Sequence, residues 1–177
     1  MTNINRQDII TMLVAGLVYL LNQCTAIYQC AAIFTAILFI INTRLLNNTA
    51  ASAYKILIAA IVISLPLYAI VGTAFSSQMT AMSLISLLVS GCTSIYITYT
   101  LNNKYSFPTS LLISLITVAM IDGLIMKSYF SAYGIFSVEK VNSIFNKELL
   151  FKACYATGIS TIMYVIEGYK RRQNISN

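Results

Sequence analysis

Two ionisable residues of this sequence lie in apolar surroundings, where charges are costly. Asp122 follows a largely apolar run over 115–121, and Lys152 follows another over 149–151. Translocon scales put the cost of an Asp or Lys side chain at the centre of a membrane helix at roughly 2.5–3.5 kcal/mol. Because of this cost, such groups usually face the interior of a helix bundle, where they pair with each other or mark the route of a solute.

The expected helices place both groups in the same half of the membrane. At a rise of about 1.5 Å per residue, Asp122 lies about 5 Å beyond the midpoint of a helix over 108–130, and Lys127 lies about 12 Å beyond it. A helix over 149–166 runs back, which puts Lys152 about 9 Å from the midpoint of that helix on the same side. Asp122 and Lys152 are therefore expected within reach of each other, whereas Lys127 can extend to the membrane surface.

Two interpretations of this pair stay open. In the first, Asp122 and Lys152 form an ion pair that joins two helices and neutralises both charges. In the second, they face a central cavity, where a carboxylate and an ammonium bind a polar heteroaromatic solute through charge-assisted hydrogen bonds. Asn22 and Asn42 add amide groups near the ends of the first two helices, although hydrogen bonds between helices explain such amides almost as well.

The composition predicts an all-α membrane protein. Of the 177 residues, 58% are hydrophobic and 9% are charged, whereas soluble domains average about 45–50% and about 25%. One transmembrane domain over 1–177 is therefore expected. The apolar runs predict a bundle of six transmembrane helices, near 9–21, 27–45, 56–75, 81–101, 108–130 and 149–166.

The longest predicted connection, over 131–148, carries an apolar pattern of its own. Its apolar residues on one helical face are Ile135, Val138, Val141, Ile144 and Phe145. This pattern fits an interfacial helix that lies flat on the outer surface of the membrane, either as a connection alone or as a lid over a substrate entrance.

Basic residues predict the orientation of the bundle. With the N-terminus inside, seven basic residues fall in cytoplasmic segments and two in external ones; the seven are Arg6, Arg44, Lys55, Lys104, Lys170, Arg171 and Arg172, and the two are Lys140 and Lys147. This bias predicts that both termini are cytoplasmic. It also explains the net charge of +6 through topology and contact with anionic lipids, so we expect the lipid bilayer and no nucleic acid as a partner.

The residue types exclude several kinds of chemistry. The sequence contains no histidine, which excludes histidine-dependent nucleophilic catalysis and imidazole metal sites. The four cysteines show no C-x-x-C spacing and are interpreted as buried free thiols; they are Cys24, Cys30, Cys92 and Cys154. No glycine-rich phosphate loop occurs. We therefore expect no enzyme, no cofactor and no metal site.

The second half of the sequence resembles a known transporter family. The residues that carry the likeness are Ser114, eight residues ahead of Asp122, the turn Tyr133-Gly134, Lys152 at the start of the last helix, and Tyr164 twelve residues further on. They are similar to the last two helices of the queuosine precursor transporters. These belong to the vitamin-uptake-transporter-like family of six-helix inner-membrane proteins, which import 7-deazaguanine bases such as preQ0 and preQ1. Residues 22–113 resemble the family more weakly.

The resemblance implies a bacterial inner-membrane importer that holds a purine-like base in the outer half of the membrane. Asp122 is then expected to accept N–H groups of the base, and Lys152 either to neutralise Asp122 or to bind the carbonyl edge of the base. The residues expected at the substrate are Asn22, Asn42, Ser114, Asp122, Lys152 and Tyr164. A homo-oligomer or an ATPase module is a possible partner.

The sequence also departs from the family. Asn42 stands where the family usually has an aspartate, and Tyr54 precedes Lys55 in place of an Arg-rich pair. Ile159 lies where some members have an acid in the last helix. Two other functional classes therefore stay open: a substrate-binding subunit of an ATPase-driven vitamin importer, and a structural subunit of a membrane complex.

Overall fold

The computed structural model of the protein describes residues 6–46, 50–72 and 76–175. In these residues the chain forms six α-helices, one 3₁₀ turn and no strand: α1 (Arg6–Leu21), α2 (Ile27–Thr43), η1 (Arg44–Leu46), α3 (Ala50–Val71), α4 (Ser77–Asn102), α5 (Phe107–Ala132) and α6 (Val138–Ile175). The predicted all-α bundle is thereby confirmed. The predicted end of the third helix at 75 lies outside the described residues.

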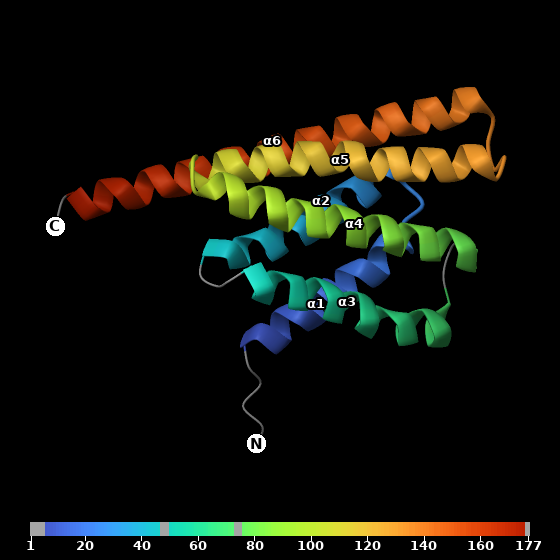
Figure 1. The fold of residues 1–177 in the computed structure, drawn as a ribbon, viewed down its shortest axis with the longest axis horizontal. Helices are drawn as coiled ribbons and strands as arrows, with labels where there is room; N and C mark the ends of the chain where they lie inside the picture. The colour runs from blue at the N-terminus through green and yellow to red at the C-terminus, as the bar shows by residue number, and fades with distance from the viewer. Residues whose placement is uncertain (1–5, 47–49, 73–75, 176–177) are drawn as a thin grey trace, which may run out of the picture.

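The six helices run alternately in opposite directions along one long axis, so that α1 begins and α6 ends at the same end of the bundle (Figure 1). Five segments, α2 with η1 and α3 to α6, are long and apolar enough to cross a membrane. With 16 residues, α1 reaches only about 24 Å, but Val14 and Val18 on this helix are fully buried in the bundle. The chain is a multi-pass membrane protein.

The ends of α4 and α5 follow from local sequence. The hydroxyl of Ser76 accepts a hydrogen bond from the Met79 backbone N–H at 3.3 Å and caps the start of α4. Pro108 lies in the first turn of α5, where its missing N–H leaves no hydrogen bond unmade. After α5, Gly134 adopts a φ of 59°, in the left-handed region that glycine enters without a steric penalty. The chain can therefore turn sharply from α5 into α6.

The hypothesis of a separate interfacial helix over 135–145 is wrong. Residues from Val138 onward are the first turns of α6, a continuous helix of 38 residues, about 57 Å long. Part of its apolar face packs against α5, since Val141 is buried and a Cβ built on Gly123 would lie 2.8 Å from Phe145 Cε2, whereas Val138 is exposed. Because Gly123 has no side chain, α6 can approach α5 closely here.

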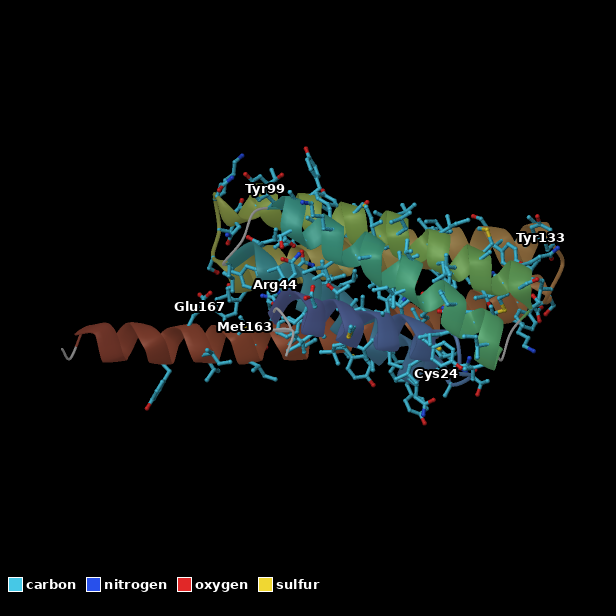
Figure 2. The ribbon with its side chains drawn as sticks, turned by 90° about the horizontal axis from the view of Figure 1, so that it is seen from below. Cys24, Arg44, Tyr99, Tyr133, Met163 and Glu167 are labelled. Carbon is cyan, nitrogen blue, oxygen red and sulfur yellow. The ribbon has the colours of Figure 1, made fainter. Side chains whose placement is uncertain are left out.

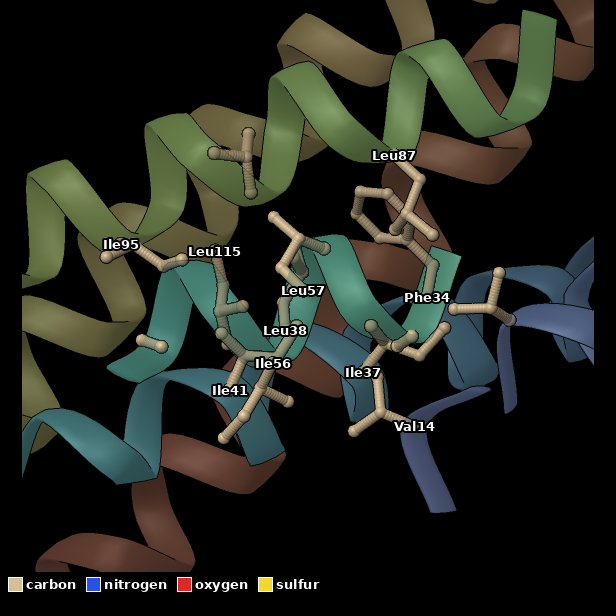
Figure 3. Close-up of a cluster of buried hydrophobic side chains, with 14 of the residues drawn as sticks. Val14, Phe34, Ile37, Leu38, Ile41, Ile56, Leu57, Leu87, Ile95 and Leu115 are labelled. Atoms are coloured by element: carbon tan, nitrogen blue, oxygen red, sulfur yellow. The ribbon is translucent and has the colours of Figure 1, made fainter. Parts of the chain in front are cut away.

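The apolar core surrounds α2, which contacts all five other helices. Ile37, Leu38 and Ile41 of α2 are fully buried and pack with Ile56 and Leu57 of α3 (Figure 3). A helix that is apolar on all sides is expected at the centre of a bundle. This central position lets the side chains of α2 reach the polar groups of the surrounding helices.

Candidate functional site

A cavity of about 210 Å³ lies between the end of α1, the starts of α2 and α4, the second half of α5 and the first half of α6. We call this end of the bundle the cavity end. Cys24 lines the cavity and lies toward the same end as Tyr133, whereas Arg44 and Glu167 lie toward the opposite end (Figure 2). The lining residues are Leu21, Asn22, Cys24, Thr25, Ile27, Cys30, Phe34, Met79, Ser83, Asp122, Met126, Phe130, Phe136, Ile144, Glu148 and Lys152.

Three charged side chains in the wall of the cavity form a charged triad. The Lys152 ammonium donates hydrogen bonds to Asp122 Oδ2 and to Glu148 Oε1, the latter at 2.6 Å. The side chains of Lys152, Asp122 and Glu148 are 2%, 8% and 18% exposed. The predicted proximity of Asp122 and Lys152 is confirmed. Their ion pair joins α5 to α6 and also borders a cavity, so the structure contains the features of both interpretations of the pair.

Asp122 is held from a third helix as well. Its Oδ1 accepts a hydrogen bond from the hydroxyl of Ser86, on α4, at 2.5 Å. Ser86 is fully buried. Both carboxylate oxygens of Asp122 therefore have partners, which fixes the orientation of this carboxylate between α4, α5 and α6.

An aromatic ring completes the surroundings of the ammonium. Lys152 Nζ lies 4.1 Å from the ring centroid of Phe34, on α2. At this distance the negative face of the ring attracts the cation. With two carboxylates and one ring around it, the buried Lys152 charge is well compensated, which a buried ion pair requires to be stable.

Asn22, directly after α1, provides a neutral polar group in the lining of the cavity. Its Nδ2 donates to the Val18 carbonyl at 3.3 Å and to Tyr68 Oη at 2.9 Å. The Tyr68 hydroxyl donates its proton to the same Val18 carbonyl at 2.8 Å, so it can only accept from Asn22, which fixes the orientation of the amide. Asn22 Oδ1 has no hydrogen-bond partner among the described residues, and it offers an acceptor in a side chain that is 2% exposed.

Two other residues predicted at the substrate, Asn42 and Ser114, do not line the cavity. Asn42 Nδ2 donates to Ser94 Oγ at 2.7 Å, and Ser94 Oγ lies 2.8 Å from Ser114 Oγ. These hydrogen bonds join α2, α4 and α5. Ser114 precedes Asp122 by two helical turns, about 12 Å along α5, which is why it misses the cavity.

Tyr164, the last residue of the predicted set, lies far from the cavity. It is 48% exposed, and its hydroxyl pairs with Thr109 Oγ1 and accepts from Ser106 Oγ at 3.4 Å. These partners lie at the start of α5, whereas Asp122 lies in the second half of that helix. The cavity thus brings together Asn22, Asp122 and Lys152 and leaves the other three predicted residues outside.

Glu148, Ser86 and Phe34 contact the predicted pair but were not predicted. Glu148 fell in the expected external connection, although its spacing of four residues from Lys152 is that of an ion pair on one helix face. Ser86 belongs to a row of hydroxyl residues at helical spacing on α4, at 80, 83, 86, 90, 94 and 98. This spacing is a second sequence pattern that indicates a polar face on α4. No sequence pattern singles out Phe34 among the apolar residues of α2.

The row on α4 continues from the cavity into the interior of the bundle. We call its inner part, with the side chains that it contacts, the polar seam; it consists of Asn42, Ser90, Ser94, Thr98 and Ser114. All five residues are fully buried. Asn42 Oδ1, Ser90 Oγ and Thr98 Oγ1 have no hydrogen-bond partner in the described structure. The seam carries no formal charge, in contrast to the cavity.

The described residues contain no group of three or more Cys, Asp or Glu side chains arranged to hold a metal ion. The polar side chains that line the cavity are those of the charged triad, the neutral Asn22, Ser83 and Thr25, and the thiols of Cys24 and Cys30.

No protein-family model, curated protein or solved structure that was compared with the chain matches it.

Proposed function

We propose that the protein is a membrane transporter that imports a small, planar, polar solute, a purine-like base of the 7-deazaguanine class. The observation that carries the proposal is the charged triad beside a cavity in an apolar bundle. Charged groups at membrane depth are costly and commonly mark the route of a solute. A pair with a purely structural role needs no cavity next to it.

The size and lining of the cavity favour a single base. Its volume of about 210 Å³ is below the roughly 300–1,000 Å³ that is typical for drug-sized ligands. Phe34, Phe130 and Phe136 border the cavity, and aromatic rings stack on nucleobases. Glu148 and Asn22 Oδ1 supply acceptors for the N–H groups of a base, and Lys152 supplies a donor for a carbonyl. The polar groups of a purine-like edge thus find matching partners.

The orientation is part of the proposal. With both termini in the cytoplasm of a bacterial cell, Arg44 and Lys104 lie on the inner side, and the cavity end faces outward. This arrangement satisfies the preference for basic residues on the cytoplasmic side. An importer receives its solute from the outer side, where the cavity would then be located.

Uptake of radiolabelled 7-deazaguanine by cells that produce only this protein tests the proposal. We expect uptake without an added ATPase component, and loss of uptake in Asp122→Asn, which keeps the shape of the side chain but removes its charge. Glu139→Gln is the matched control, because Glu139 is an exposed carboxylate on α6 that does not line the cavity. A folded wild-type protein that takes up no base would contradict the proposal.

The second candidate is a structural subunit of a membrane complex, and the ion pair between α5 and α6 favours it. In that case Asp122→Asn would weaken the fold, and no solute would be transported by the wild-type protein. Measuring the thermal stability of Asp122→Asn beside its uptake separates the two candidates. A stable variant without uptake supports the transporter.

A further inference from the structure

We propose that Glu148 is a ligand-binding carboxylate that makes the cavity select a cationic solute, one that carries a single ammonium or amidinium group. This inference rests on the proposed function, since it assumes that the cavity is the solute site. It goes further by assigning a charge preference within the proposed solute class: 7-deazaguanine itself is neutral, and a base of this class that carries an ammonium group should bind more tightly through Glu148.

The first argument is the charge balance of the cavity. Its charged lining residues are Asp122, Glu148 and Lys152, two carboxylates against one ammonium. No other lysine or arginine is among the lining residues; Lys140 Nζ lies 4.4 Å from the ring centroid of Phe136, and Lys127 Nζ lies 5.2 Å from that of Phe145. The enclosure therefore carries one excess negative charge, which a monocationic solute would neutralise.

The second argument is that the two carboxylates differ. Asp122 uses one oxygen for Ser86 and the other for Lys152. Glu148 uses only Oε1, for Lys152, and its Oε2 has no hydrogen-bond partner among the described residues. The Glu148 side chain is also the more exposed of the two, at 18% against 8%. Asp122 thus fixes Lys152, and Glu148 is the carboxylate that is free to receive a ligand.

The third argument comes from the neutral part of the lining. Asn22 is 2% exposed, lines the cavity, and keeps only its acceptor oxygen free. Phe130 adds an aromatic ring to the lining, and the face of such a ring attracts cations. Free acceptors and aromatic faces recognise a ligand rich in N–H donors, which is the chemistry of an ammonium or amidinium group.

Two probes that differ in charge test the inference on the wild-type protein in lipid nanodiscs. Benzylammonium and benzyl alcohol have the same ring and nearly the same size, but only the first is charged at neutral pH. We expect benzylammonium to bind with a dissociation constant about tenfold to a hundredfold lower, as expected for a hydrogen bond to a charged group. Titration calorimetry measures both constants, and 7-deazaguanine is titrated in parallel.

Glu148→Gln assigns the preference to this residue. The variant keeps the shape of the side chain and leaves the ion pair between Lys152 and Asp122, so we expect it to fold and to bind the two probes with similar affinity. Glu139→Gln, the same substitution at an exposed site on α6, should keep the wild-type preference. If Glu148→Gln does not fold, the ratio of the two dissociation constants measured on the wild-type protein still shows whether the cavity prefers a cationic solute.

The outcomes separate the inference from the proposed function. Equal affinity for both probes, binding of neither, or a preference that survives in Glu148→Gln would overturn the inference, even if 7-deazaguanine binds and the proposed function stands. A preference that depends on Glu148, without binding of 7-deazaguanine, would uphold the inference and contradict the proposed base as the solute.

Discussion

The cavity and the polar seam are two buried polar regions of the same bundle, and they use similar residue types. Asn22 borders the cavity and Asn42 belongs to the seam, and each donates through Nδ2 to another helix. The cavity combines such a group with formal charges and with empty space, whereas the residues of the seam carry no formal charge. An amide in a membrane helix therefore indicates a binding site only where a void and a charge lie next to it.

The two regions also differ in what holds them. The charged triad joins α5 and α6, with Ser86 on α4 and the Phe34 ring on α2 as further contacts. The seam joins α2, α4 and α5 through neutral hydroxyl and amide groups. Neutral hydrogen bonds contribute less than charge-assisted ones, so we expect substitutions in the triad to affect stability more strongly than substitutions in the seam.

Lys152→Met should have the largest effect on stability. It leaves the carboxylates of Asp122 and Glu148 without their shared cation, and breaking a buried ion pair typically costs about 3–5 kcal/mol. Denaturant unfolding in detergent measures the loss. Lys147→Met is the matched control on α6, where Lys147 is exposed, and should stay within about 0.5 kcal/mol of the wild type.

Removing all three charges sharpens this comparison. Asp122→Asn, Glu148→Gln and Lys152→Met combined should regain most of the stability lost in Lys152→Met alone, because no buried charge is then left unpaired. We expect the triple variant to fold but to transport nothing. Uptake by this neutral variant would show that the charges serve the fold alone.

Asn42→Leu should have an intermediate effect. It removes the hydrogen bond to Ser94, at a cost of about 1–2 kcal/mol, while Ser94 keeps Ser114 as its partner. Because Asn42 does not line the cavity, we expect uptake per folded molecule to stay at the wild-type level. A loss of uptake at unchanged stability would mean that Asn42 contributes to the substrate site, as the sequence predicts.

Ser90→Ala should have the smallest effect. Its Oγ is buried without a hydrogen-bond partner in the described structure, so the substitution breaks no bond and removes a buried polar atom. We expect a change of about 0.5 kcal/mol or less in the free energy of unfolding. A clearly larger loss in a thermal melt would mean that this hydroxyl has a partner, such as an ordered water.

The sequence predicts the helices and the ion pair because both follow from distance along the chain. Apolar runs give the helices, and a fixed rise per residue puts Asp122 and Lys152 at the same depth. The start of α6 was missed because Lys147 and Glu148 interrupt the apolar run, although packing against α5 keeps these turns helical. Hydropathy alone does not detect such polar turns of a helix. For this reason it also does not place Glu148 on the same helix as Lys152.

Sequence patterns also do not show where a bundle leaves empty space. Asn22, Asn42 and Ser114 are all polar residues within apolar segments, and all three are buried. Only the positions of the neighbouring helices show that the first borders a cavity and the other two bind each other's helices. The volume between helices depends on side chains from five helices at once, which no spacing along one segment can reveal.

The reactivity of Cys30 tests most directly that the charged triad borders a cavity open to solutes. Cys30 lines the cavity, and serine in place of Cys24, Cys92 and Cys154 leaves it as the single thiol. A cavity with excess negative charge concentrates cations. We therefore predict that a cationic methanethiosulfonate reagent labels Cys30 about tenfold faster than an anionic one. A cysteine placed in the seam by Ser94→Cys should stay unlabelled. Equal labelling rates, or no labelling of Cys30 at all, would contradict the account.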